Sequence, residues 1–302
     1  MDAVIMHTKK AHMLRPTTKK NKTESTFCIT YIAFFLAARF TLHQLARTLS
    51  VYWIWVLAQG SGPSNSPSKA LLAVLDALLA KLRHSEYPSA QVIGTDLSPI
   101  QPPWVPPNCV FEIDDFESDW LYKNKFDFIH GRELEGCVAD EERLFRQAFE
   151  HLRPGGYLEW VGAYAWFFSD DGTDEKAEYT KKWLKLFHEA AGKFGKSFET
   201  APTWKEKMEK VGFVDVKQTV FKVPFGPWPK DQKLKEIGRF EQVQQIQAVE
   251  AYTPALLSRF LGWSNDEIQV LIAKVRSELK DPAIHQYITT YVVYGRKPEE
   301  KS

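Results

Sequence analysis

Acidic side chains close two short apolar stretches of this sequence. The segment AQVIGTD ends at Asp96, and the segment CVFEIDD ends at Asp114 and Asp115. A carboxylate offers only acceptor atoms, so an acid at a strand end suits the two hydroxyls of a ribose, and acids on the next strand suit the amino group of adenine. The spacing therefore predicts an adenosyl-binding half-site. The alternatives are a helix cap or turn residue at Asp96 and a solvated acidic loop over residues 112–119.

A third stretch, KFDFIHGREL, brings His130 and Arg132 toward a strand end. Histidine is the side chain that titrates nearest neutral pH, so His130 is the candidate for a base that accepts a proton from a substrate. A histidine that only hydrogen-bonds a neighbouring loop is the alternative. Arg132 and Glu133 are expected to pair either with a ligand or with each other.

The elements that would position these residues follow a strand and helix alternation. The segment EERLFRQAFEHLRPGGYLEW, residues 141–160, reads as a helix with one apolar face, a Pro-Gly-Gly terminator and a new strand. Strands alternating with helices predict an α/β fold with a mostly parallel sheet. Ligands of such sheets bind at the carboxyl ends of the strands, where Asp96, Asp114, Asp115 and His130 are expected.

Several strings in the chain resemble the LaeA-like class I methyltransferases of filamentous fungi. The resemblance covers about residues 86–298 and includes VIGTDLSPIQPPWVPPNCVFEIDD, FDFIHGREL, LRPGGYLEW, GFVDVKQTVFKVPFGPWPKDQKLKEIGRF, LGWSNDEIQVLIAKVRSELKD and YVVYGRKP. It implies a Rossmann-like three-layer sandwich with a seven-stranded, mostly parallel sheet. It also implies S-adenosyl-L-methionine as methyl donor. Finally, it implies a role in secondary metabolism, either as a regulator partnered with velvet proteins or as an enzyme acting on a small metabolite.

The C-terminal third agrees with this fold. Residues 214–223 read as a strand, Ser264 and Glu267 form a capping box ahead of a helix, and residues 287–294 read as a β-branched and aromatic strand. We expect the last two strands to form the antiparallel pair that distinguishes a methyltransferase sheet from a dinucleotide-binding one.

Members of the family carry a glycine-rich cofactor loop just before the segment EYPSA, whereas here that position is occupied by VLDALLAKLRHS. Three interpretations fit. The strand VYWIWVLA, residues 51–58, with Gly60 and Gly62 after it, replaces the missing strand and loop; however, Gly60 stands 36 residues before Asp96, against about 20 in the usual fingerprint. Alternatively, residues 1–85 come from a mistaken gene model. In the third interpretation, the protein has lost cofactor binding.

The N-terminal region is expected to consist of a disordered basic tail over residues 1–25 and an atypical apolar region over residues 26–85, followed by the methyltransferase domain. Its apolar runs, residues 27–38 and 51–58, are shorter than the roughly 18 residues of a membrane helix. A buried helix over residues 27–47 is favoured over a signal anchor, and membrane association is the minor alternative.

Composition narrows the remaining function classes. The formal net charge of +1 gives no overall field for binding nucleic acid directly. The three cysteines form no C-x-x-C pair, so neither a metal site nor a disulfide framework is predicted, and a cytoplasmic or nuclear location is expected. The sequence thus predicts a methyltransferase acting on a metabolite or a protein. The alternative is a catalytically inactive regulator that keeps the fold and the surface for a partner protein but has lost the cofactor.

Overall fold

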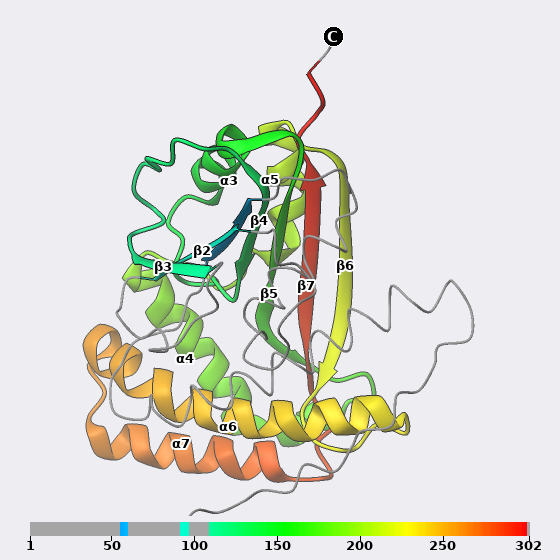
Figure 1. The fold of residues 1–302 in the computed structure, drawn as a ribbon. Helices are drawn as coiled ribbons and strands as arrows, with labels where there is room; N and C mark the ends of the chain where they lie inside the picture. Colours follow the sequence, from blue (N-terminus) through cyan, green and yellow to red (C-terminus); the bar gives the residue numbers. More distant parts are fainter. Residues whose placement is uncertain (1–54, 60–90, 97–108, 301–302) are drawn as a thin grey trace, which may run out of the picture.

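The computed structural model describes residues 55–59, 91–96 and 109–300 of this chain (Figure 1). Seven strands form one sheet in the order β3-β2-β1-β4-β5-β7-β6. Their bounds are Trp55–Gln59 (β1), Gln91–Asp96 (β2), Cys109–Ile113 (β3), Phe126–Arg132 (β4), Leu152–Phe168 (β5), Val214–Pro224 (β6) and Tyr287–Arg296 (β7). The strands predicted at residues 90–96, 109–115, 214–223 and 287–294 are confirmed.

Most of these strands run in one direction. β2 is parallel to β3, and β4 is parallel to β5, whereas β1 and β7 are antiparallel to both of their neighbours. Five of the seven described strands therefore share a direction, and their carboxyl ends meet at one edge. The α/β class with a mostly parallel sheet is confirmed, and so is the antiparallel pairing of β6 with β7.

β1 lies in the central position of the sheet, as expected for a strand that replaces the missing one, but its direction is reversed. Gln59, its last residue, is opposite Gln91, the first residue of β2, while Trp55 is opposite Thr95. The chain therefore leaves β1 at the edge away from Asp96. Gly60 and Gly62 lie outside the described residues, and their role as cofactor contacts stays a prediction. Most of the predicted N-terminal tail and apolar region also lies outside the described residues.

One face of the sheet packs on α3 (Glu141–His151) and α5 (Trp204–Val211). Trp160 of β5 is buried there, with its ring edge-on to Phe145 at 5.1 Å and to Trp204 at 6.3 Å. Asp140 caps α3 by accepting a hydrogen bond from the Arg143 amide. The helix predicted from residue 141 is confirmed. This tryptophan-rich contact fixes β4 and β5 against the helices.

A second apolar cluster joins α4 (Glu178–Phe194), α6 (Gln232–Leu261) and α7 (Asn265–Lys280). The predicted capping box of Ser264 and Glu267 starts α7. In Figure 1 these helices gather at the end of the molecule toward which β5 runs. Two short 3-10 turns, Thr173–Lys176 (η1) and Ala201–Thr203 (η2), precede α4 and α5. Among the described residues, no helix combines the length and apolar character needed to cross a bilayer.

Candidate functional site

Two of the predicted acids, Asp96 and Asp114, lie one residue apart in register at the carboxyl ends of β2 and β3. Asp96, the last residue of β2, is the backbone partner of Ile113, the last residue of β3. Asp114 is the residue directly after Ile113. The acids Asp96 and Asp114 therefore lie at the ends of two neighbouring parallel strands, on the same edge of the sheet. This register is the geometry that the predicted adenosyl half-site requires.

The carboxylates of Asp114 and Asp115 are exposed, and each accepts a hydrogen bond from a nearby backbone amide. The Asp115 amide donates to Asp114 Oδ1 at 2.8 Å, and the Glu117 amide donates to Asp115 Oδ1 at 2.9 Å. Within residues 109–300, neither carboxylate uses its Oδ2 in a hydrogen bond. Each acid therefore retains an acceptor atom for a ligand, while its backbone contact limits its motion.

His130 lies in β4, two residues before the strand ends. Its Nδ1 is 2.9 Å from Glu159 Oε1 on β5, and both side chains are only 5% exposed. The Phe128 ring stacks against the imidazole with 6.2 Å between centroids. His130 and Glu159 are also backbone partners, so the parallel register itself creates the contact. A carboxylate on Nδ1 fixes the imidazole and leaves Nε2 for another partner.

Glu159 is a site residue that the sequence analysis missed. It lies in the string LRPGGYLEW, where it is an acid in the middle of a strand that is otherwise apolar. That placement was the available signal, because a buried acid requires a partner. The partner could not be read from sequence, since it depends on the pairing register of β4 and β5.

The predicted residues spread along the edge rather than converge on one point. Val56 of β1 pairs with Gly94 on one side and with His130 on the other. His130 thus lies level with Gly94, two residues before Asp96, and two strand spacings, about 10 Å, away. This separation is suited to one extended ligand with contacts at both places.

Charged residues crowd the end of β4, in what we call the β4-end cluster: Arg132, Glu133, Glu135 and Glu241. Arg132 Nε lies 3.9 Å from Glu133 Oε1, so these neighbours do pair with each other, and Glu133 adopts a left-handed φ of 52°. The Glu135 carboxyl is buried, and its Oε1 has no hydrogen-bond partner among the described residues. Burial raises the pKa of Glu135 well above its ordinary value, and the charge of Glu133 adds to the shift.

Glu241, on α6, is 3% exposed, and we include it in this cluster because the charges of Arg132 and Glu133 act on it. Gln245, one helical turn later, donates to its Oε1 at 2.8 Å, while Oε2 has no partner in the described part of the chain. Burial is the main reason that the pKa of Glu241 is raised to about 8; the charge of Glu133 adds to the increase, and the Gln245 hydrogen bond and Arg132 oppose it. The carboxyl is thus close enough to the end of β4 to respond to both charges there.

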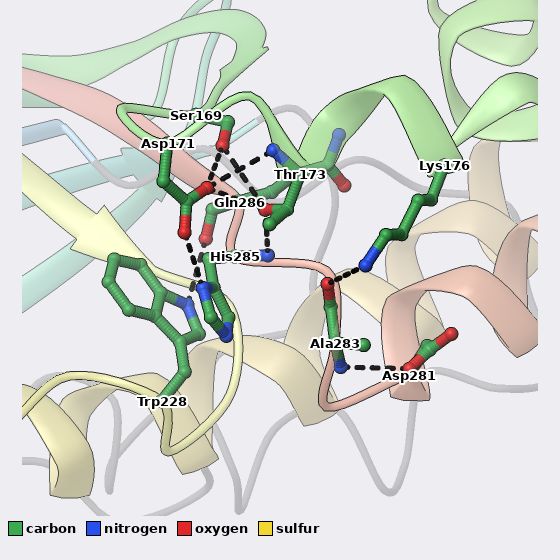
Figure 2. Close-up of polar contacts among 9 residues, drawn as sticks. All are labelled: Ser169, Asp171, Thr173, Lys176, Trp228, Asp281, Ala283, His285 and Gln286. Carbon is green, nitrogen blue, oxygen red and sulfur yellow. Dashed lines mark hydrogen bonds and ion pairs between the residues drawn. The ribbon is translucent and has the colours of Figure 1, made fainter.

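A second polar group, the β5-loop cluster, consists of Ser169, Asp171, Thr173 and His285. Figure 2 shows Asp171 at its centre, with hydrogen bonds from Ser169 Oγ at 2.8 Å and Thr173 Oγ1 at 2.7 Å. His285 Nδ1 lies 2.7 Å from Asp171 Oδ2, and the Trp228 ring stacks on the imidazole. These hydrogen bonds, that of His285 first, lower the pKa of Asp171 below its ordinary value. The cluster ties the loop after β5 to the start of β7.

Comparison with known proteins identifies the family. A model described as a methyltransferase domain matches residues 75–218. The methyltransferase pytC of Aspergillus terreus is 38% identical over 70% of this chain, and the match spans 66% of pytC, just under two thirds of its length. The probable methyltransferase tdiE of Emericella nidulans is 32% identical, with 78% of this chain and 75% of tdiE covered. The chain belongs to the LaeA-like methyltransferases. Another relative, the secondary metabolism regulator LAE1 of Cochliobolus heterostrophus, is 31% identical over 71% of each chain.

The residues of this LaeA-like chain fit one half of the family's methyl donor, S-adenosyl-L-methionine. Asp96 ends β2 opposite Ile113, and Asp114 is the next residue after Ile113; carboxylate oxygens suit the hydroxyl and amino donors of an adenosyl group. For the methionine half of the cofactor, the described residues offer no comparable contact. β1 runs in the opposite direction, and no described strand ends in a glycine-rich turn at the edge near Asp96.

Proposed function

We propose that this chain is an S-adenosyl-L-methionine-dependent methyltransferase of fungal secondary metabolism that acts on a small metabolite or a protein. The observation that carries the proposal is the register of β2 and β3, in which Asp96 and Ile113 are partners and Asp114 follows at the same edge. Membership of the LaeA-like family supports it.

In this proposal each site residue has a defined role. Asp96 accepts hydrogen bonds from the ribose hydroxyls, and Asp114 or Asp115 accepts one from the adenine amino group. When bound, S-adenosylmethionine supplies a methyl group made electrophilic by the neighbouring sulfonium. His130 accepts the proton that the acceptor loses, through the ring nitrogen that Glu159 does not contact. Gly60 and Gly62 stay a prediction from the sequence.

The central test is cofactor affinity. Asp96→Ala is expected to weaken S-adenosylhomocysteine binding by about 1.5–3 kcal/mol, the usual contribution of charge-assisted hydrogen bonds. Titration calorimetry measures the change. Asp119→Ala is the matched control, since Asp119 is an exposed acid that pairs with Arg143. Equal affinity of wild type and Asp96→Ala would contradict the assignment of Asp96.

A second candidate function is a regulator that keeps the fold without binding the cofactor. The reversed direction of β1 favours it, because the strand that normally delivers the cofactor loop ends at the wrong edge. A protein with a cooperative thermal transition and no detectable binding of S-adenosylhomocysteine would establish this alternative.

We also propose that the partner is either a metabolite or a velvet-type regulatory protein, and that the chain works in the cytoplasm or nucleus. The relatives named as secondary metabolism regulators support a protein partner. Fractionation of fungal cells tests the location, and recovery in a salt-resistant membrane pellet would contradict it.

A further inference from the structure

Glu117 fixes the acidic loop, residues 114–120, which carries two acids of the adenosyl half-site. Its amide donates to Asp115 Oδ1 at 2.9 Å, and the next amide, that of Ser118, donates to the Asp115 carbonyl oxygen at 2.9 Å. The Asp115 amide in turn donates to Asp114 Oδ1. The orientation of both carboxylates therefore depends on where Glu117 is held.

The side chain of Glu117 is held by a different part of the chain. Oε1 accepts a hydrogen bond from the Ala139 amide, and Oε2 accepts one from Lys196 Nζ at 2.7 Å. Lys196 Nζ also donates to the Cys137 carbonyl oxygen at 2.7 Å. The Lys196 and Glu117 side chains are only 18% and 28% exposed, so solvent screens this ion pair less than a pair on the open surface. One ammonium group thus joins the acidic loop to the segment between β4 and α3.

The backbone around Lys196 gives its ammonium group a fixed origin. α4 ends directly before Gly195, which has a left-handed φ of 80°, a conformation typical of a helix C-terminus. The Lys196 amide donates to the Ala191 carbonyl oxygen at 3.2 Å, and the Gly136 amide donates to the Ser197 carbonyl oxygen at 3.0 Å. The segment after α4 is therefore bonded to its own helix on one side and to the segment after β4 on the other.

α3 holds the later part of the acidic loop. Arg143 donates to Asp119 Oδ1 at 2.7 Å and also to the Glu117 carbonyl oxygen. Gln147 donates to the Ser118 carbonyl oxygen at 3.1 Å. None of these bonds uses the Glu117 carboxylate. Loss of the ammonium group on that carboxylate should therefore release the end of the loop next to the acids and leave the rest in place.

We propose that Lys196 is a positioning residue for the methyl donor: through Glu117 it holds the two acids in the orientation that receives the adenine amino group. The proposal rests on the methyltransferase function above and deepens it, because it adds to the cofactor site a residue from the end of α4, outside the parallel strands. Its effect on the cofactor passes through the acidic loop. A loop that adopts its binding conformation only part of the time reduces the apparent affinity by that fraction.

Titration calorimetry of S-adenosylhomocysteine on the full chain at pH 7 tests the proposal. Lys196→Met keeps the length and the apolar stem of the side chain and removes its charge. We expect the dissociation constant to rise about fivefold, the scale of a partly exposed ion pair. Lys196→Arg still offers donors to both oxygens and should bring the affinity back to within about twofold of wild type.

Lys193→Met is the matched control. Lys193 belongs to the same helix and pairs with Glu189 one turn before it, where both side chains are largely exposed. Its replacement should leave the affinity unchanged.

Glu117→Gln tests the other side of the same ion pair, and it carries the test if Lys196→Met does not fold. This variant should weaken binding to a similar extent. The double variant Lys196→Met/Glu117→Gln should bind no more weakly than either single variant, because both changes break the same bond.

Hydrogen exchange measured by mass spectrometry without ligand follows the loop itself. In Lys196→Met we expect faster exchange over residues 112–121 and unchanged exchange over α7, which shows that the fold is intact. Equal affinity of wild type and Lys196→Met, an equal loss in Lys193→Met, or unchanged exchange over residues 112–121 would overturn the proposal.

The same titrations separate the two proposals. If wild type and Lys196→Met bind S-adenosylhomocysteine equally well, the positioning role is wrong and the methyltransferase proposal stands. If wild type does not bind it, the methyl donor assignment fails, and the role of Lys196 at a cofactor site fails with it.

Discussion

The β4-end cluster and the β5-loop cluster both place carboxylates beside a basic side chain, yet their electrostatics are opposite. Asp171 in the loop accepts hydrogen bonds from Ser169, from both the amide and hydroxyl of Thr173, and from His285. Glu241 accepts one, from Gln245. The pKa of Asp171 is lowered by its hydrogen bonds, whereas burial raises that of Glu241 to about 8.

This difference in hydrogen bonding shows which cluster retains carboxyl oxygens without a partner among the described residues. The Asp171 side chain is 48% exposed, so water completes whatever its partners leave open, and its contacts serve to hold the loop against β7. Glu241 and Glu135 have neither water access nor enough protein donors. Polar groups in that condition cost stability unless something else binds them, which is a common property of functional sites.

The largest expected effect is the pH dependence of stability caused by Glu241. Its pKa is raised from 4.5 to about 8 in the folded protein, so its contribution to stability is complete below pH 4.5 and is lost as the pH rises through 8. Relative to Glu241→Gln, wild type should lose on the order of 1.4 kcal/mol per pH unit within this interval. Urea unfolding of both proteins at several pH values measures this difference. Parallel curves would show that Glu241 has an ordinary acidity.

Gly162 tests whether the buried position of Glu135 is tightly specified. A Cβ at residue 162 would lie 1.5 Å from Glu135 Oε1 and 3.0 Å from the Trp204 ring. Gly162→Ala is therefore expected to destabilise the fold by about 1–3 kcal/mol, the cost of overpacking. Chemical denaturation measures it.

Gly192→Ala in α4 provides the matched control for that substitution. No atom lies within 4 Å of a Cβ at residue 192, and alanine is the better helix former, so this variant should gain up to about 1 kcal/mol. Equal stability of the two alanine variants would mean that Glu135 relocates at no cost.

Sequence reasoning located the strand that ends at Asp96, the helix capped by Asp140 and the capping box of α7, because each rests on a local signal in neighbouring residues. It could not set the direction of β1. An apolar strand between two others satisfies its hydrogen bonds either way, and its residues do not encode the choice.

The missed site residues share another cause. Glu159 contacts His130 through the pairing register of β4 and β5, and Glu241 on α6 responds to the charges of Arg132 and Glu133. Both relations join segments distant in sequence, so neither residue shows them locally. An isolated acid in the apolar strand before Trp160 was the one available signal.

The two histidine–carboxylate pairs sharpen the comparison, because one is buried and one is exposed. Glu159→Leu removes the acceptor from buried His130 and is expected to cost about 1–3 kcal/mol, whereas Glu159→Gln keeps an acceptor oxygen and should cost about 1 kcal/mol. Urea unfolding at pH 7 measures both, with Glu150→Gln as the control at an exposed acid. If the leucine and glutamine variants are equally stable, the 2.9 Å contact contributes nothing to stability.

The exposed pair should show the smallest effect. Asp171→Asn keeps acceptor and donor atoms for Ser169 and Thr173, and solvent screens the lost charge opposite His285. We expect the melting temperature at pH 7 to change by at most about 2 °C. Because the folded pKa of Asp171 is lowered from 3.8, the small advantage of wild type is present above pH 3.8 and disappears as the pH falls through the lowered value. A much larger shift in Asp171→Asn would show that the exposed pair contributes as much to stability as the buried pair, and would remove the distinction between the two regions.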